Sequence, residues 1–130
     1  MGLIMDKERE RSEHIEQREF VFWFRKMFPQ SMIFAIPNGG QRSKISGMKL
    51  KLEGVVPGIP DLMCPELFLF IEMKKTKKGQ LSKEQEIVIK YLNNIGYTCI
   101  IGYGCEDAKK KTLNFLESKN MIYSVKLYLT

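Results

Sequence analysis

Two ionisable residues, Glu72 and Lys74, directly follow the apolar run at residues 67–71. Five consecutive apolar residues predict a buried strand, in which an unpaired charge would be costly. Side chains alternate between the two faces of a strand, so Glu72 and Lys74 share one face. The pair indicates either a chemical site at the end of a buried strand or, more simply, an exposed strand end with a surface ion pair.

A third ionisable residue, Asp61, precedes the same strand. If an antiparallel hairpin turns at residues 65–66, Phe70 pairs with Asp61. The backbones of Asp61 and Glu72 are then diagonal neighbours on one sheet face, about 7–8 Å apart. Two carboxylates at that separation can bind a cation between them, with Lys74 beside it. This interpretation requires an even number of residues in the turn.

A long amphipathic helix is predicted over residues 6–28, ending before Pro29. At 100° per residue, Glu16 shares one stripe with large apolar side chains, namely Phe20, Trp23, Phe24 and Met27. A carboxylate on a core-facing stripe is unusual, which makes Glu16 a candidate site residue. Glu13 lies one turn earlier on the same face and is an alternative. A second interpretation is that the charged half of this helix is simply solvated.

A second helix is predicted from Ser82 to the residue before Gly96. Gln85 lies three residues after Ser82, which is the capping-box position. It also lies on the stripe predicted to face the core, which continues through Val88, Tyr91, Leu92 and Ile95. Gln85 is therefore interpreted either as a helix cap or as a site residue.

Two loops combine positive charge with turn chemistry. The Pro-Asn-Gly-Gly turn at 37–40 leaves backbone amides open to a phosphate, and a basic loop follows directly after Lys74. Plain solvated loops are the simpler alternative. The candidate nucleic-acid-binding residues in these loops are Asn38, Gly39, Gly40, Arg42, Lys44, Lys75, Lys77 and Lys78.

The remaining pattern predicts strands at 31–36 and 97–103 and helices at 45–53 and 106–118. Residues 121–129 alternate as a strand does, and could form either an extra C-terminal edge strand or a dimer contact. The order of elements predicts an α/β fold, in which helices flank a small mixed sheet as a sandwich.

Composition places further bounds on the chain. Its 130 residues predict one domain spanning 1–130, and the net charge of +6 with a pI of about 9.2 is compatible with a polyanionic partner. We expect no signal peptide and no membrane anchor. Cys64, Cys99 and Cys105 lack metal-ligand spacing, so reduced thiols in a cytoplasmic compartment are predicted.

Pro60-Asp61, ten further residues and then Glu72-Met73-Lys74 fit the pattern P-D, x(n), E-x-K. With its flanking motifs, the sequence over about residues 13–116 resembles the virus-type replication-repair nuclease (VRR-NUC) domain. That domain belongs to the restriction-endonuclease-like superfamily, named PD-(D/E)XK for its pattern. The segments that carry the resemblance are Glu16-Gln17, the turn at 37–40, Glu53-Gly54, the PGIPD segment at 57–61, IEMK at 71–74, Leu81-Ser82, Glu84-Gln85 and Gly96-Tyr97.

The resemblance implies a role for each site residue. Asp61 and Glu72 would bind Mg²⁺ or Mn²⁺ together with the backbone carbonyl of Met73, and Glu16 would join directly or through a water. Lys74 would orient or activate the attacking water, or stabilise the charge of the transition state. Gln85 matches the family's polar residue on the following helix. Oxygen ligands suit these hard cations, which promote phosphodiester hydrolysis.

The resemblance further implies a metal-dependent DNA endonuclease acting on branched or structured DNA, such as flaps or Holliday-junction-like substrates. Small stand-alone members look like proteins of viruses or bacteria, so we expect cytoplasmic action in a bacterial or phage-infected cell, with a role in DNA repair. A homodimer could present two active sites to a four-way junction. The alternatives are a DNA-binding module without turnover and a nuclease subunit that needs a partner such as a helicase.

Overall fold

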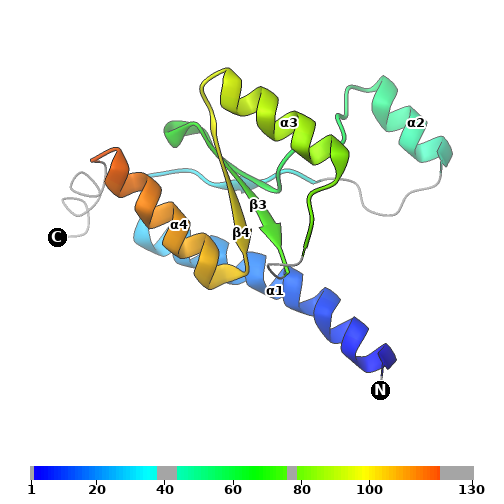
Figure 1. The fold of residues 1–130 in the computed structure, drawn as a ribbon, viewed down its shortest axis with the longest axis horizontal. Coiled ribbons are helices and arrows are strands. Elements are labelled where there is room, and N and C mark those ends of the chain that lie inside the picture. The colour runs from blue at the N-terminus through cyan, green and yellow to red at the C-terminus, as the bar shows by residue number, and fades with distance from the viewer. Residues whose placement is uncertain (1, 38–43, 76–78, 121–130) are drawn as a thin grey trace.

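A computed structural model of the chain describes residues 2–37, 44–75 and 79–120 (Figure 1). The described helices and strands are α1 (Gly2–Met27), β1 (Phe34–Ala35), α2 (Lys44–Leu52), β2 (Leu62–Cys64), β3 (Leu69–Lys74), α3 (Lys83–Asn94), β4 (Thr98–Tyr103) and α4 (Cys105–Ser118). The strand predicted at 121–129 lies outside the described residues.

The strands form one mixed sheet in the order β1-β2-β3-β4. β1 and β2 pair antiparallel, β2 and β3 form an antiparallel hairpin, and β3 pairs with β4 in parallel. In Figure 1, α3 lies on one side of β3 and β4, and α1 and α4 lie on the other. The predicted α/β sandwich with a small mixed sheet is therefore confirmed.

The alternation of β3 decides which side chains enter the core. Leu69, Ile71 and Met73 join the buried apolar cluster that contains Phe20 and Phe24 of α1. The intervening residues of β3, including Glu72 and Lys74, point to the opposite face, which α3 covers. The core thus holds one face of β3, and the other face carries the buried ring of Phe70 followed by the polar side chains of Glu72 and Lys74.

The hairpin register differs from the predicted one. β3 begins at Leu69 because residues 65–67 form a single 3₁₀ turn, and Phe68 closes it with a positive φ of 51°. The turn therefore holds four residues, and Phe70 pairs with Met63 instead of Asp61. The predicted pair was wrong by two positions. Because an even shift keeps every side chain on its face, the register, continued one pair further, brings Asp61 directly opposite Glu72.

The predicted buried stripe of α3 was partly wrong. Leu92 is buried, but Tyr91 is 61% exposed and Ile95 is 53% exposed. Gln85, Val88 and Ile89 are half-buried, so α3 turns the stripe that these residues form with Leu92 toward the protein and leaves Tyr91 and Ile95 outside it. Among the described residues, no helix is both long and apolar enough to cross a membrane.

Candidate active site

Asp61 directly precedes β2 and is fixed by two hydrogen bonds. Its backbone carbonyl accepts from the Ile36 amide at 2.8 Å, and its Oδ2 accepts from the Met73 amide at 2.8 Å. The first bond ties Asp61 to the chain after β1, and the second ties its carboxylate to β3. A carboxylate can accept several hydrogen bonds, so Asp61 keeps acceptor capacity after this bond.

Glu72 lies in the middle of the sheet and is 3% exposed. Its Oε1 accepts a hydrogen bond of 3.0 Å from Gln85 Nε2 on α3. Burial of an ionised carboxylate is costly without compensating polar or cationic neighbours. This environment is suited to a carboxylate that binds a cation.

Lys74 lies two residues further along β3 on the same face. Its Nζ donates to Gln85 Oε1 at 3.1 Å, so the side-chain amide of Gln85 contacts both Lys74 and Glu72. Asp61, Glu72, Lys74 and Gln85, four of the predicted catalytic residues, are therefore brought together on the face of the sheet under α3.

Gln85 also caps its own helix, which confirms the first of the two interpretations offered by the sequence, and its role at a catalytic site stays a prediction. The backbone amide of Gln85 donates to Ser82 Oγ at 3.1 Å, and the side-chain Oε1 of Gln85 accepts from the backbone amide of Ser82 at 2.9 Å. This is a complete capping box. Because the box fixes the first turn of α3, it also fixes the side-chain amide of Gln85, which contacts Glu72 and Lys74.

A close backbone approach sets the position of α3. A Cβ added at Gly58 would lie 2.6 Å from the carbonyl atoms of Glu84 and 2.8 Å from the Gln85 nitrogen. Gly58 also has a φ of +91°, which favours glycine. The segment that leads into Asp61 therefore packs against the turn that carries Gln85.

Glu16 has a different set of neighbours. Its carboxylate accepts a hydrogen bond from the amide of Cys105, the first residue of α4. A carboxylate at a helix N-terminus is favourable, and the helix's own N-cap, Gly104, provides no side chain. Glu16, Glu19 and Cys105 bring their potential ligand atoms within 4.8 Å of one another. In the described part of the chain, α4 fixes the Glu16 carboxylate, and the role of Glu16 in metal binding stays a prediction. The side chain of Glu13, the alternative, lies outside the described part.

Most of the predicted nucleic-acid-binding residues also lie outside the described part of the chain: Asn38, Gly39, Gly40, Arg42, Lys77 and Lys78. Lys44 is the first residue of α2, and its side chain is not described. Lys75 is exposed and directly follows β3. It therefore lies one residue beyond Lys74, at the end of the strand that carries the site.

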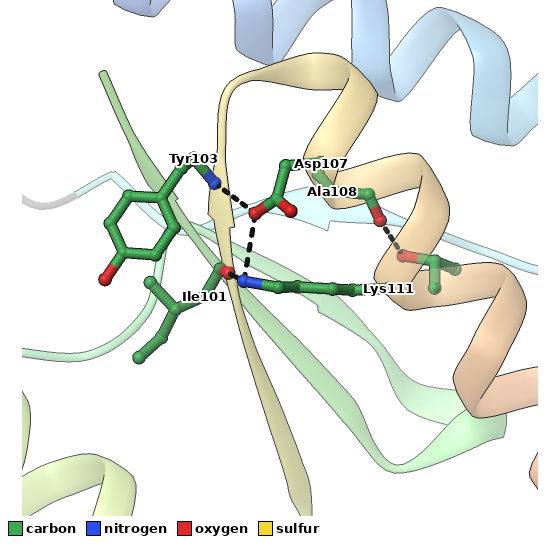
Figure 2. A network of polar contacts seen from close by, with 6 residues as sticks. Ile101, Tyr103, Asp107, Ala108 and Lys111 are labelled. Carbon is green, nitrogen blue, oxygen red and sulfur yellow. Dashed lines mark hydrogen bonds and ion pairs between the residues drawn. The ribbon is translucent and has the colours of Figure 1, made fainter. Parts of the chain in front are cut away.

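A polar network that the sequence analysis missed holds the end of β4 (Figure 2). Lys111 Nζ donates to the Ile101 carbonyl at 2.7 Å and forms an ion pair of 2.9 Å with Asp107 Oδ2. The same Oδ2 accepts from the Tyr103 amide at 2.9 Å. Ile101 pairs with Glu72 and Tyr103 with Lys74, so α4 fixes the strand next to the site. The i,i+4 spacing of Asp107 and Lys111 was the available signal.

The three cysteines are free thiols and are unsuited to nucleophilic chemistry. Burial raises the pKa of Cys64 and Cys105 above the ordinary value, and it raises the pKa of Cys99 to about 11. A thiol with a raised pKa carries little thiolate near neutral pH.

Comparison with known proteins supports the fold. No family model matches the sequence, and no curated protein matches it. A solved structure described as a VRR_NUC domain protein matches with 21% sequence identity and a TM-score of 0.66. The match covers 82% of this chain and 88% of that one. The chain therefore has the fold of a VRR_NUC nuclease domain, and the resemblance seen in the sequence is confirmed at the level of the fold.

Proposed function

We propose that this protein is a divalent-metal-dependent DNA endonuclease that hydrolyses phosphodiester bonds in branched or structured DNA. One observation carries the proposal: Asp61, Glu72 and Lys74 lie on one face of a nuclease-type sheet, and Gln85 contacts both residues of β3. The spacing of these residues is that of the P-D, E-x-K pattern.

The donor set fits a hard cation. Asp61 and Glu72 supply carboxylate oxygens from neighbouring strands, and Mg²⁺ or Mn²⁺ prefers oxygen ligands. The Met73 amide points toward Asp61, and the N–H and C=O of one strand residue point to the same side, so the Met73 carbonyl is a suitable third ligand. Glu16 is a further candidate, directly or through a water.

A divalent cation bound there would lower the pKa of an attacking water and offset charge on the phosphate. Lys74 supplies the remaining chemistry from this chain. Its ammonium is held by Gln85 Oε1, which fixes its direction while leaving donors for the attacking water or a phosphate oxygen. Gln85 also fixes one oxygen of Glu72, which orients that carboxylate toward its ligand.

Several features support DNA as the substrate. The net charge of +6 favours a polyanion, and the basic loop that contains Lys75, Lys77 and Lys78 follows directly after Lys74. The turn at 37–40, with Arg42 and Lys44 beyond it, would contact the phosphate backbone. The sequence has no pattern for reading base edges, so substrate choice would depend on DNA shape.

A homodimer is the assembly that we propose for junction cleavage. It is supported by the apolar side chains exposed on the outer side of α3, namely Ile87, Tyr91 and Ile95. A two-fold dimer would bring one active site to each of two symmetric strands. Dependence on a partner such as a helicase would instead appear as cleavage only after that protein is added.

The test is a panel of labelled single-stranded, duplex, flap and four-way-junction DNAs, incubated with Mg²⁺, Mn²⁺ or EDTA. We expect cleavage of a branched substrate that requires the metal and is lost in Asp61→Ala. Metal-independent binding without cleavage of any DNA would favour the binding-module alternative. Cleavage that persists unchanged in Asp61→Ala would show that the site is elsewhere.

A further inference from the structure

The outer face of α1 carries an exposed aromatic ring between two cations. Phe22 is 71% exposed, whereas Phe20 and Phe24 of the same helix are fully buried. Because 100° separates successive residues, Phe22 points almost directly away from the core. Arg18 and Lys26 lie four residues before and after Phe22, so all three share one exposed stripe.

Phe22 also separates two hollows in this surface, of about 610 and 640 Å³. Arg18, Phe22 and Lys26 line both hollows. The Lys26 ammonium lies 6.0 Å from the centroid of the Phe22 ring. Other charged residues extend the lining, with Arg25 in the first hollow and Glu19 and Lys109 in the second.

We propose that this α1 face, defined by Arg18, Phe22 and Lys26, binds an unpaired strand of nucleic acid. An exposed ring is a platform on which a base can stack, and cations on either side can contact the adjoining phosphates. A base offers its flat face only where it is unpaired, so single strands fit this surface better than duplex. Lys109 is paired with Glu106, and the remaining cations of the lining, Arg18, Arg25 and Lys26, outnumber the single carboxylate of Glu19, which favours an anionic occupant.

A second copy of the chain is a poorer occupant. A two-fold contact centred on Phe22 would place Arg18 and Lys26 against the same residues of the other copy. Like charges facing each other across an interface are costly. The apolar side chains on α3 carry no such penalty, so self-association there would leave the α1 face free.

Strand binding at the α1 face is a function separate from the proposed endonuclease activity. The α1 face lies on the side of the sheet opposite to α3, which covers the candidate active site. Glu72 and Lys74 contact Gln85 of α3, so the two surfaces would contact different parts of a nucleic acid. Strand binding at α1 requires no metal and no turnover. It can therefore be tested whether or not the chain proves to be a nuclease.

The test measures the fluorescence anisotropy of a labelled oligothymidylate and of a matched duplex, in EDTA. We expect Phe22→Ala to weaken single-strand binding by about fivefold or more, and Phe22→Trp to retain it. Lys26→Gln should reduce the slope of log K against log salt concentration by about 0.7. Circular dichroism would verify that each variant is folded.

Two matched controls lie away from α1. Phe68→Ala removes another exposed aromatic ring, and Lys90→Gln removes the same charge as Lys26→Gln from another exposed helix position. Both should bind the oligonucleotide as the wild type does. Equal weakening by Lys90→Gln and Lys26→Gln with no effect of Phe22→Ala would overturn the proposal, because it would indicate diffuse charge attraction. A fall in solution mass caused by Phe22→Ala would also overturn it, because it would identify a contact between copies.

Discussion

The side-chain amide of Gln85 has one polar nitrogen and one polar oxygen, and both form hydrogen bonds at the candidate site. Its nitrogen donates to Glu72 and its oxygen accepts from Lys74, while the same oxygen completes the cap of α3. A single residue therefore joins the start of a helix to the two ionisable residues of β3. Residues that orient a metal-binding carboxylate in this way are typically important for activity.

Gln85→Ala should accordingly lower metal-dependent cleavage by about 10–100-fold. The matched control is Ser82→Ala, which removes the bond from the Gln85 backbone amide to Ser82 Oγ at a cost of about 1 kcal/mol. It keeps the bond from the Ser82 backbone amide to Gln85 Oε1, which still holds that side chain against Glu72 and Lys74. Cleavage rates and urea unfolding of both variants would be measured together. If both variants lose activity in proportion to their stability, Gln85 acts only as a cap.

The Cys99 thiol makes the stability of the protein depend on pH. Burial raises its pKa from 9.0 in the unfolded chain to about 11 in the folded one. The folded state therefore holds this proton more tightly, and the resulting stabilisation is complete below pH 9.0 and is lost as the pH rises through about 11. Urea midpoints of the wild type and Cys99→Ala would be compared across this range. The advantage of the wild type should shrink with rising pH, and a constant difference would contradict the assignment.

At the scale of elements, the bounds of the helices and strands could be predicted from the sequence better than the pairing and exposure of their residues. Helices α1, α3 and α4 and strands β3 and β4 were expected from periodicity and from their Pro, Gly and Ser boundaries. The register of the hairpin was not expected, because no local sequence signal distinguishes a two-residue turn at Pro65 from a four-residue turn closed by Phe68. The exposure of Tyr91 and Ile95 also depends on how far the sheet extends, which periodicity does not report.

The contact between the segment before Asp61 and α3 leads to a prediction for glycine. Gly58→Ala should destabilise the fold and lower cleavage, because its Cβ would displace the backbone at Glu84 and Gln85. Gly54→Ala is the control, since Gly54 also has a positive φ of 101° but nothing within 4 Å of an added Cβ. Backbone strain alone costs of the order of 1–3 kcal/mol at either position. Thermal unfolding and cleavage rates of the two variants would separate backbone strain from the close approach at Gly58. Equal losses of stability and activity in both variants would show that the close approach is unimportant.

At the scale of the whole molecule, one side of the sheet packs into the apolar core and the other carries the candidate site. One side of β3 packs Leu69, Ile71 and Met73 into the core against α1, and the other side carries Glu72 and Lys74 under α3. Core packing thus holds the strand from behind while its polar face stays available for chemistry. The outer surface of α1, with its cations and Phe22, lies on the far side of this core.

Much of the candidate site could be predicted from the sequence, because Asp61, Glu72 and Lys74 follow a pattern with a fixed strand period. The position of Glu16 could not, because helical periodicity gives the face of a helix but not its neighbour. Glu16 faces the N-terminus of α4, where it accepts from the Cys105 amide. The Asp107–Lys111 network also depends on the packing of α4 against the edge of β4, which follows only from the fold (Figure 2).

The central claim is that Asp61 and Glu72 bind the divalent cation that cleavage requires. Single-turnover cleavage of a labelled branched DNA would be measured with Mn²⁺ for the wild type and for Glu72→Gln, which keeps the shape of the side chain and removes its charge. We expect a fall in rate of at least about 10²-fold, together with weaker Mn²⁺ binding by calorimetry and unchanged thermal unfolding. Cleavage by Glu72→Gln at the wild-type rate and with the same Mn²⁺ dependence would contradict it.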